Sequence, residues 1–428
     1  MWGDRSRRAE QAAQARLAAE VAAIPGSGLA GRTVTEDPPV WAEPAATLGG
    51  HPGQIAAMAF SPDGRWLATA DDRDTTILWD VTTPDRPLRI QSISPRAPAA
   101  AEQSATVPWR YRQPLSFHGK YRPGRSVTFG PDGRVLAAGL TSGLILLWDV
   151  TDPTHPAQIA VLHRPRSGWA GRWTGSARSV AFSPDGQTLV AGYDVWSATW
   201  DLGDSHRPPR ASTLLKGVPI NAVGFSQQGV LAVGGHRGGL RPLVVWSAAK
   251  PPQPRFVAKP RVAHLSQWKG RGVSSVLSLA FSPGRRLLAT ACEHQYDVSD
   301  EHVWVPASHD GNVILWDLTY PSYPARLATL TQRGGIRMDA GRWQRRWQPT
   351  TFLGHAGQVR SVAFSNDGHI LATASDDEDV LLWNVTDSLR PRCLARVPHQ
   401  RPVHTIAFSP TSRVLATGGA EALLWVVP

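Results

Sequence analysis

The sequence predicts an all-β protein, a seven-bladed β-propeller that is closed by an N-terminal strand and carries a short N-terminal helix. Two recurring residues and the position of the chain end support this prediction. A phenylalanine followed by a turn recurs at Phe60, Phe129, Phe182, Phe225, Phe281, Phe364 and Phe408. A tryptophan that ends an apolar run follows each of them, at Trp79, Trp148, Trp200, Trp246, Trp316, Trp383 and Trp425. Seven units in phase indicate a repeat architecture.

Each unit has the pattern of four short strands. In the first unit, residues 55–61 alternate in the manner of a strand, and the sequence SPDG at 61–64 has the proline and glycine of a tight turn. A second strand at 66–70, a third at 75–81 and a fourth at 88–93 complete the unit. Four antiparallel strands repeated around an axis form a propeller.

The two ends of the chain complement each other. The last unit stops after its third strand, and residues 42–48 match the fourth-strand position. We expect this N-terminal strand to complete the seventh blade and remove an exposed sheet edge. The predicted organisation is therefore an Ala- and Arg-rich helix at 1–24, a linker at 25–41 and the propeller at 42–428.

Composition excludes several protein classes. No apolar run approaches the ~18 residues that a membrane-spanning helix needs, so we expect no membrane association. The N-terminus lacks the apolar segment of a secretory signal. With Cys292 and Cys393 as the only cysteines, a disulfide framework is excluded and a cytoplasmic location is expected.

The repeat resembles the WD40 family. The tripeptide LWD occurs at 78–80, 147–149 and 315–317, and the dipeptide GH occurs at 50–51 and 354–355. The style of the repeat looks like that of actinobacterial propellers, which are often attached to signalling NTPases or kinases. The resemblance implies that the chain could be the C-terminal sensor part of such a protein.

The resemblance also implies buried hydrogen-bonded tetrads of His, Ser or Thr, Asp and Trp. In the first blade these would be His51, Thr69, Asp74 and Trp79, with Asp74 displaced by one residue from the usual spacing. In the sixth blade they would be His355, Thr373, Asp377 and Trp383 at the usual spacing. We interpret these residues as structural, since a buried carboxylate and imidazole must pair with each other or lose solvation.

We expect no enzymatic activity, no cofactor and no metal. The sequence has no nucleophile motif, no phosphate-binding glycine loop and no paired-cysteine zinc signature. The polar stretch 292–304 contains His294, Asp297, Asp300, Glu301 and His302, but their spacing matches no standard metal site.

Four of the connections between blades are expanded and share a composition. Each is rich in tryptophan and basic residues, and all four are expected on one face of the propeller. The predicted partner-binding residues are Trp109, Arg110, Arg112, Trp169, Arg172, Trp173, Trp268, Lys269, Arg271, Arg342, Trp343, Arg345, Arg346 and Trp347.

These connections hold the excess charge. Segments 94–118, 163–173, 260–272 and 331–350 carry net charges of +2, +3, +3 and +4, which together exceed the +11 of the whole protein. Trp and Arg are the residues most enriched in binding hot spots. The sequence therefore predicts a non-enzymatic scaffold that binds an acidic protein or peptide in signalling or assembly. The alternatives are a nucleic-acid or polyanion binder and a structural role in which these tryptophans pack onto the ring.

Overall fold

The computed structural model describes a large part of the chain, mostly within the predicted propeller. The described residues are 40, 43–93, 126–163, 175–194, 196–203, 211–216, 219–235, 243–247, 255–258, 271–296, 311–319, 325–330, 338–339, 342–343 and 354–427. None of them belongs to a helix that could span a membrane.

Six four-stranded antiparallel sheets each consist of consecutive strands. Blade 1 contains β2 (Ile55–Phe60), β3 (Trp66–Asp71), β4 (Thr76–Asp80) and β5 (Leu88–Ile93). Blade 2 contains β6 (Ser126–Phe129), β7 (Val135–Gly139), β8 (Ile145–Asp149) and β9 (Ala157–Leu162). Blade 3 contains β10 (Ala177–Phe182), β11 (Thr188–Tyr193), β12 (Trp196–Asp201) and β13 (Ala211–Lys216).

The other three follow the same order. Blade 4 contains β14 (Ile220–Phe225), β15 (Val230–Gly235), β16 (Leu243–Ser247) and β17 (Arg255–Ala258). Blade 5 contains β18 (Arg271–Phe281), β19 (Leu287–Tyr296), β20 (Gly311–Asp317) and β21 (Ala325–Leu330). Blade 6 contains β24 (Val359–Phe364), β25 (Ile370–Ser375), β26 (Asp379–Asn384) and β27 (Arg392–Pro398).

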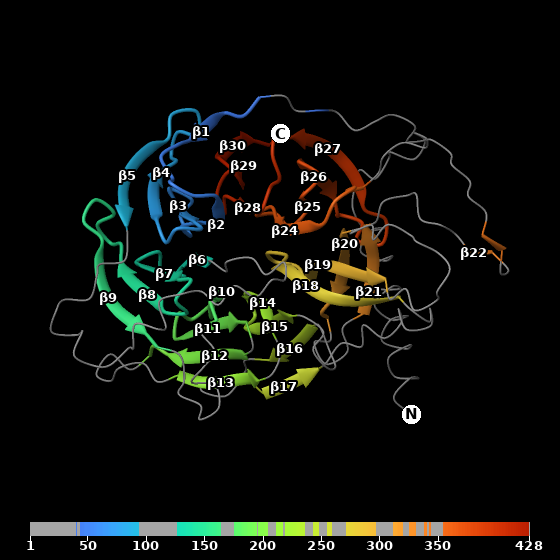
Figure 1. Ribbon diagram of the computed structural model, residues 1–428, viewed down its shortest axis with the longest axis horizontal. Helices are drawn as coiled ribbons and strands as arrows, with labels where there is room; N and C mark the ends of the chain where they lie inside the picture. Colours follow the sequence, from blue (N-terminus) through green and yellow to red (C-terminus); the bar gives the residue numbers. More distant parts are fainter. Residues whose placement is uncertain are drawn as a thin grey trace.

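A seventh four-stranded sheet, the closing sheet, joins the two ends of the chain. It contains β28 (Thr405–Phe408), β29 (Val414–Gly418), β30 (Ala422–Val426) and, from the other end of the chain, β1 (Ala46–Leu48). In β1, Thr47 lies opposite Leu423. Figure 1 shows the sheets arranged in a ring, with the first strand of each sheet nearest the centre and β1 on the outside. The only other described sheet is the pair β22 (Met338–Asp339) and β23 (Arg342–Trp343), which lies away from the ring.

The predicted fold class needs correction in two respects. It included an N-terminal helix, but the described residues contain no helix, and residues 1–24 lie outside them. That prediction rested on alanine propensity, although a helix gains most of its stability from packing an apolar face, and 1–24 has few large apolar residues. The prediction also gave seven blades, whereas the described residues form six self-contained blades, and the remaining four-stranded sheet is a composite of the two ends of the described chain.

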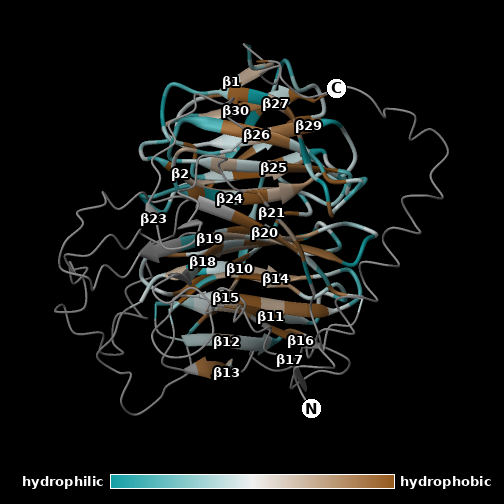
Figure 2. Cartoon of the chain, turned by 90° about the vertical axis from the view of Figure 1, so that its right-hand side faces the viewer, coloured by the Kyte–Doolittle hydropathy of each residue, from teal (hydrophilic) through white to brown (hydrophobic). Residues whose placement is uncertain are grey.

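The core lies between neighbouring sheets rather than inside one. Strand residues alternate between two faces, and both faces of an inner strand are covered by the adjacent sheets. Ala289 and Leu315 of blade 5 pack with Leu381 and Trp383 of blade 6 in one buried cluster. Figure 2 shows the sheets stacked in successive layers, with apolar residues in the strands and polar residues mainly in the turns.

Serine hydroxyls connect several neighbouring blades near the axis. The backbone N–H groups of Val180, Val223, Val362 and Ile406 donate to the hydroxyls of Ser126, Ser179, Ser278 and Ser361 at 2.9, 3.0, 3.3 and 3.2 Å. A shift of strand register just before each of Val180 and Val223 accompanies these bonds. These hydrogen bonds tie four pairs of neighbouring sheets together where no strand pairing does so.

Candidate interaction surface

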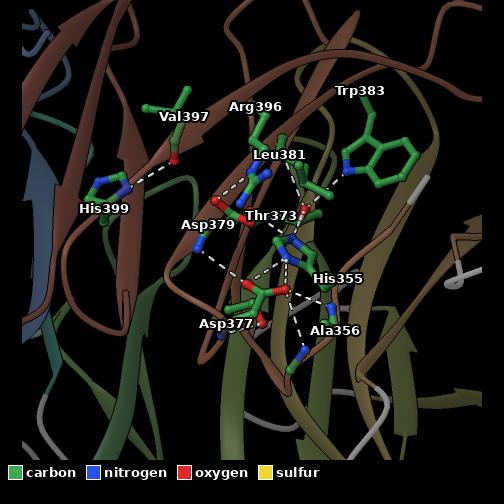
Figure 3. Close-up of polar contacts among 12 residues, drawn as sticks. His355, Ala356, Thr373, Asp377, Asp379, Leu381, Trp383, Arg396, Val397 and His399 are labelled. Carbon is green, nitrogen blue, oxygen red and sulfur yellow. Dashed lines mark hydrogen bonds and ion pairs between the residues drawn. The ribbon is translucent and has the colours of Figure 1, made fainter. Parts of the chain in front are cut away.

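Blade 6 contains a complete buried tetrad (Figure 3). His355 Nδ1 lies 3.1 Å from the carboxylate of Asp377, and its Nε2 lies 2.7 Å from the Thr373 hydroxyl. The Trp383 indole N–H donates to the same hydroxyl at 3.0 Å. His355 is only 4% exposed and both its ring nitrogens are occupied, so the pair has no free position for a substrate. The geometry is that of a structural network.

The Asp377 carboxylate is held in its charged form. Burial would raise its pKa, but the hydrogen bond and charge of His355 and the backbone N–H of Ala356 outweigh burial and lower the pKa to about 2. The Ala356 N–H donates to this carboxylate at 2.7 Å. Asp377 therefore fixes the segment that enters β24 as well as the imidazole.

In blade 1, the predicted Asp74 does not belong to the tetrad. Thr69 accepts from the Trp79 indole at 2.8 Å and lies 2.6 Å from His51 Nε2, as the resemblance implies. The carboxylate beside His51 Nδ1, at 3.3 Å, is that of the fully buried Asp71. Asp74 instead accepts from the Thr141 hydroxyl of blade 2 at 2.9 Å.

The turn geometry explains this correction. The turns after β3 and β25 have equal length, since Ala70 pairs with Thr76 and Ala374 pairs with Val380. Asp74 thus occupies the position of Glu378, and both have positive φ, 66° and 70°. Asp71, at the end of β3, supplies the carboxylate of this tetrad instead. It also accepts hydrogen bonds from backbone N–H groups of the following turn.

Tryptophan hydrogen bonds divide the ring into two arcs. In blades 5, 6 and 1 and in the closing sheet, a threonine accepts from the tryptophan indole, at Thr290, Thr373, Thr69 and Thr417. The corresponding positions in blades 2, 3 and 4 are Ala138, Ala191 and Val233. Consequently the buried Trp148 indole nitrogen has no hydrogen-bond partner among the described residues. In blade 3 the Trp200 indole donates instead to the His163 carbonyl, at 3.4 Å.

The expanded connections attach to a single rim of the ring, which we call the insert rim. In blade 1, Ile93 at the end of the fourth strand lies opposite Thr76, and Ile55 at the start of the first strand lies opposite Asp71. The connection between blades thus starts and finishes beside the turn that joins the second and third strands. The same antiparallel order in each blade brings all four expanded connections to this rim.

Several carboxylates on the insert rim are already bonded within the ring. Asp376 pairs with Arg360, and Asp379 accepts from Arg396 at 2.8 Å. Asp194 pairs with Arg178 in the same way in blade 3. These aspartates in the turns of the ring are therefore paired with arginines of the ring itself.

Most of the predicted partner-binding residues lie outside the described part of the chain. Three of them are placed by their backbone: Arg271 begins β18, and Arg342 and Trp343 form β23. The residues outside are Trp109, Arg110, Arg112, Trp169, Arg172, Trp173, Trp268, Lys269, Arg345, Arg346 and Trp347. In the polar stretch 292–304, residues 297–304 also lie outside, and the described residues elsewhere contain no cluster suited to a metal ion.

A family model agrees with the repeat. The model, described as WD domain, G-beta repeat, matches residues 42–80, 169–197, 264–317, 347–384 and 391–424. The chain belongs to the WD40-repeat family. The matched segments leave out blades 2 and 4, which are also two of the three blades without the threonine. In this WD40 propeller, the two unmatched blades thus both lack the threonine, although blade 3, which is matched, lacks it as well.

Relatives of this WD40 chain share the repeat over parts of longer proteins. It is 25% identical to Telomerase protein component 1 of Rattus norvegicus over 88% of this chain and 13% of that protein. It is 34% identical to the Ribosome biogenesis protein BOP1 homolog of Dictyostelium discoideum over 18% of this chain and 9% of that protein. The chain thus spans a small share of either relative. The solved structure of U3-55K has the same fold, with a TM-score of 0.58 and 18% identity over 89% of this chain and 98% of that chain.

Proposed function

We propose that this WD40 propeller is a non-enzymatic interaction scaffold that binds an acidic protein or peptide through its insert rim, in cytoplasmic signalling or assembly. The observation that carries the proposal is the pairing of the rim carboxylates within the ring. Asp376 is paired with Arg360 and Asp379 with Arg396, so they are poorly placed to neutralise the expanded connections. The positive charge of those connections is then available to bind acidic groups of another molecule.

Composition supports the same proposal. The four connections combine arginine, which binds carboxylates with two parallel hydrogen bonds, with tryptophan, which supplies a large apolar contact area. A rigid ring that presents four such segments on one rim suits a partner that makes several contacts at once. Attachment to a signalling NTPase or kinase remains a prediction of the sequence.

A second candidate function is binding of nucleic acid through the same connections. Two relatives carry names that refer to telomerase and to ribosome biogenesis, and tryptophan can stack on bases while arginine binds phosphates. The two candidates differ in salt dependence, because each phosphate contact contributes about one log unit of affinity per log unit of salt.

Affinity capture from a nuclease-treated lysate tests the proposal. The bait is wild type or a variant with Trp343→Ala, Trp347→Ala, Arg345→Glu and Arg346→Glu, at low and moderate salt. We expect wild type to retain an acidic protein that the variant loses by at least tenfold. The matched control is Arg134→Glu with Arg413→Glu, which makes the same charge change at exposed positions on the opposite rim.

Three outcomes distinguish the candidates. Loss with the insert variant but not with the control supports the scaffold. Nucleic acid retained by wild type alone, in the absence of nuclease, supports the second candidate. Equal capture by wild type and the insert variant contradicts both and indicates that the tryptophans pack onto the ring.

A further inference from the structure

The rim opposite the insert rim, which we call the turn rim, is formed by the turns between the first and second strands. At four blade junctions, a turn glycine with positive φ packs against the turn of the preceding blade. A Cβ atom added at Gly133 would lie 3.5 Å from Pro62, and one at Gly186 would lie 3.2 Å from Pro131. The other two glycines, Gly64 and Gly368, pack on Thr411 and on Pro283. Turn-on-turn packing closes these junctions.

The junction between blades 4 and 5 breaks this pattern. Blade 4 has Gln227 where blades 1 to 3 have proline. In blade 5 the sequence SPGR places glycine one position earlier, so that Arg285 stands where the turns of the other five blades have glycine. Around Gly284 there is open space, since an added Cβ atom would meet nothing within 4 Å.

Arg285 holds blade 5 to the opposite neighbour. Its guanidinium donates to the backbone carbonyls of Gly368, Val385 and Thr386 of blade 6 at 3.2, 2.9 and 3.0 Å. It also donates to the hydroxyl of the fully buried Ser388 at 3.3 Å. The turn of blade 5 is thus fastened to blade 6 by a side chain, whereas toward blade 4 it makes a hydrogen bond from the Gly284 N–H to Gln227 Oε1 at 3.2 Å.

A pocket of about 240 Å³ lies between blades 4 and 5 on the turn rim. Its floor is apolar and belongs to the core cluster of blades 4 and 5, whereas its rim is polar. The floor consists of Val230, Phe281 and Leu318, and the rim includes Gln228, Arg286 and Thr319. The volume is below the roughly 300–1,000 Å³ of pockets that enclose drug-sized molecules, so it suits one or two side chains.

Charge separates this junction from the turns of blades 1, 2, 3 and 6. The corresponding turns of blades 1, 2, 3 and 6 each hold an aspartate, at Asp63, Asp132, Asp185 and Asp367. The turns of blades 4 and 5 have glutamine or glycine there, and the exposed Arg286 stands at the edge of the pocket, where it donates to the Thr319 carbonyl at 3.4 Å. A carboxylate of a partner at this edge would meet Arg286, whose own turn contains no aspartate.

We propose that the pocket between blades 4 and 5 binds an extended segment of a protein partner in which an apolar residue stands next to an acidic one. The apolar side chain enters between Val230, Phe281 and Leu318, and the adjacent carboxylate pairs with Arg286. This site lies on the turn rim and is independent of the function proposed for the insert rim.

Fluorescence anisotropy with a dye-labelled peptide, Gly-Glu-Leu-Asp-Gly, tests the site. We expect saturable binding with a Kd below about 1 mM, as suits one side chain and one ion pair. Arg286→Glu should weaken binding at least tenfold and Arg286→Lys much less. Arg134→Glu, the same change at the corresponding exposed turn position of blade 2, should leave Kd within about twofold. Circular dichroism verifies that each variant is folded, and Arg286→Gln replaces Arg286→Glu if the latter is not.

Two control peptides separate the apolar contact from the charge. Both Gly-Gln-Leu-Asn-Gly and Gly-Glu-Gly-Asp-Gly should bind at least tenfold more weakly than the test peptide. The proposal is overturned by the absence of saturable binding, or by equal loss in Arg286→Glu and Arg134→Glu, which would indicate general attraction to a basic protein. Equal binding of the glycine peptide would show that the pocket takes no part.

Discussion

At the scale of single residues, the tetrads show that position in a turn decides which carboxylate bonds to the histidine. Asp71 and Asp74 stand three residues apart, yet only Asp71 reaches His51. Asp71 also accepts from the N–H groups of Gly53, Arg73 and Thr75, at 3.2, 2.9 and 2.9 Å. It thereby organises the turn after β3 and the segment that enters β2.

Exchanging each aspartate for asparagine tests this assignment. Asp71→Asn should lower the free energy of unfolding by about 2–3 kcal/mol, because both buried carboxylate oxygens accept hydrogen bonds and asparagine replaces one of them with an NH2 donor. Asp74→Asn should cost less than about 1 kcal/mol, since asparagine tolerates positive φ and can still accept from Thr141. Urea unfolding measures both, and a larger loss for Asp74→Asn would contradict the assignment.

The Asp377 carboxylate predicts a pH dependence of stability. Its pKa is lowered from 3.8 to about 2 in the folded protein, so its contribution is fully present above about pH 4 and is lost as pH falls toward 2. Between pH 5 and pH 3, wild type should therefore lose more stability than Asp377→Asn. Urea midpoints measured across this range test the prediction, and parallel curves for the two proteins would refute it.

At the scale of elements, β1 is short but contributes to a shared core. Leu48 is 2% exposed and packs in one cluster with Trp79 of blade 1 and Leu424 of the closing sheet. A single bridge between Val40 and Arg396 of β27 precedes it. Closure of the ring thus depends on a three-residue strand and one buried leucine.

Truncation of this leucine tests the closure. Leu48→Ala should reduce the free energy of unfolding by about 2–5 kcal/mol, as for other fully buried leucines. The matched control is Leu88→Ala in β5, where the side chain is 63% exposed and the change should stay within about 0.5 kcal/mol. Thermal unfolding followed by circular dichroism compares them. Similar effects of the two substitutions would mean that β1 does not hold the ring closed.

At the scale of the whole molecule, the ring separates two rims of different character. The insert rim receives the basic, tryptophan-rich connections, and several of its carboxylates are paired within the ring. The turn rim carries aspartates except around the closing sheet and the junction of blades 4 and 5. A ring with two distinct rims can hold two partner segments at the same time.

Sequence patterns predicted the strands well because each depends on local chemistry. The strand that ends in Phe60, the SPDG turn and the alternating run up to Trp79 all lie in the expected order. The role of Asp71 was not predicted. Which of Asp71 and Asp74 reaches His51 depends on how the turn after β3 aligns with the equally long turn after β25. The pocket beside Arg286 depends on packing between turns of different blades. Its one sequence signal was the displaced glycine of SPGR, at Gly284.

The measurement that tests the central claim most directly is amide hydrogen exchange on the propeller with and without the captured partner. Binding at the insert rim predicts increased protection in 94–118, 163–173, 260–272 and 331–350, with little change in the turns at 61–65 and 131–134. Protection confined to the turn rim, or none in these four segments, would contradict the account and place the partner elsewhere.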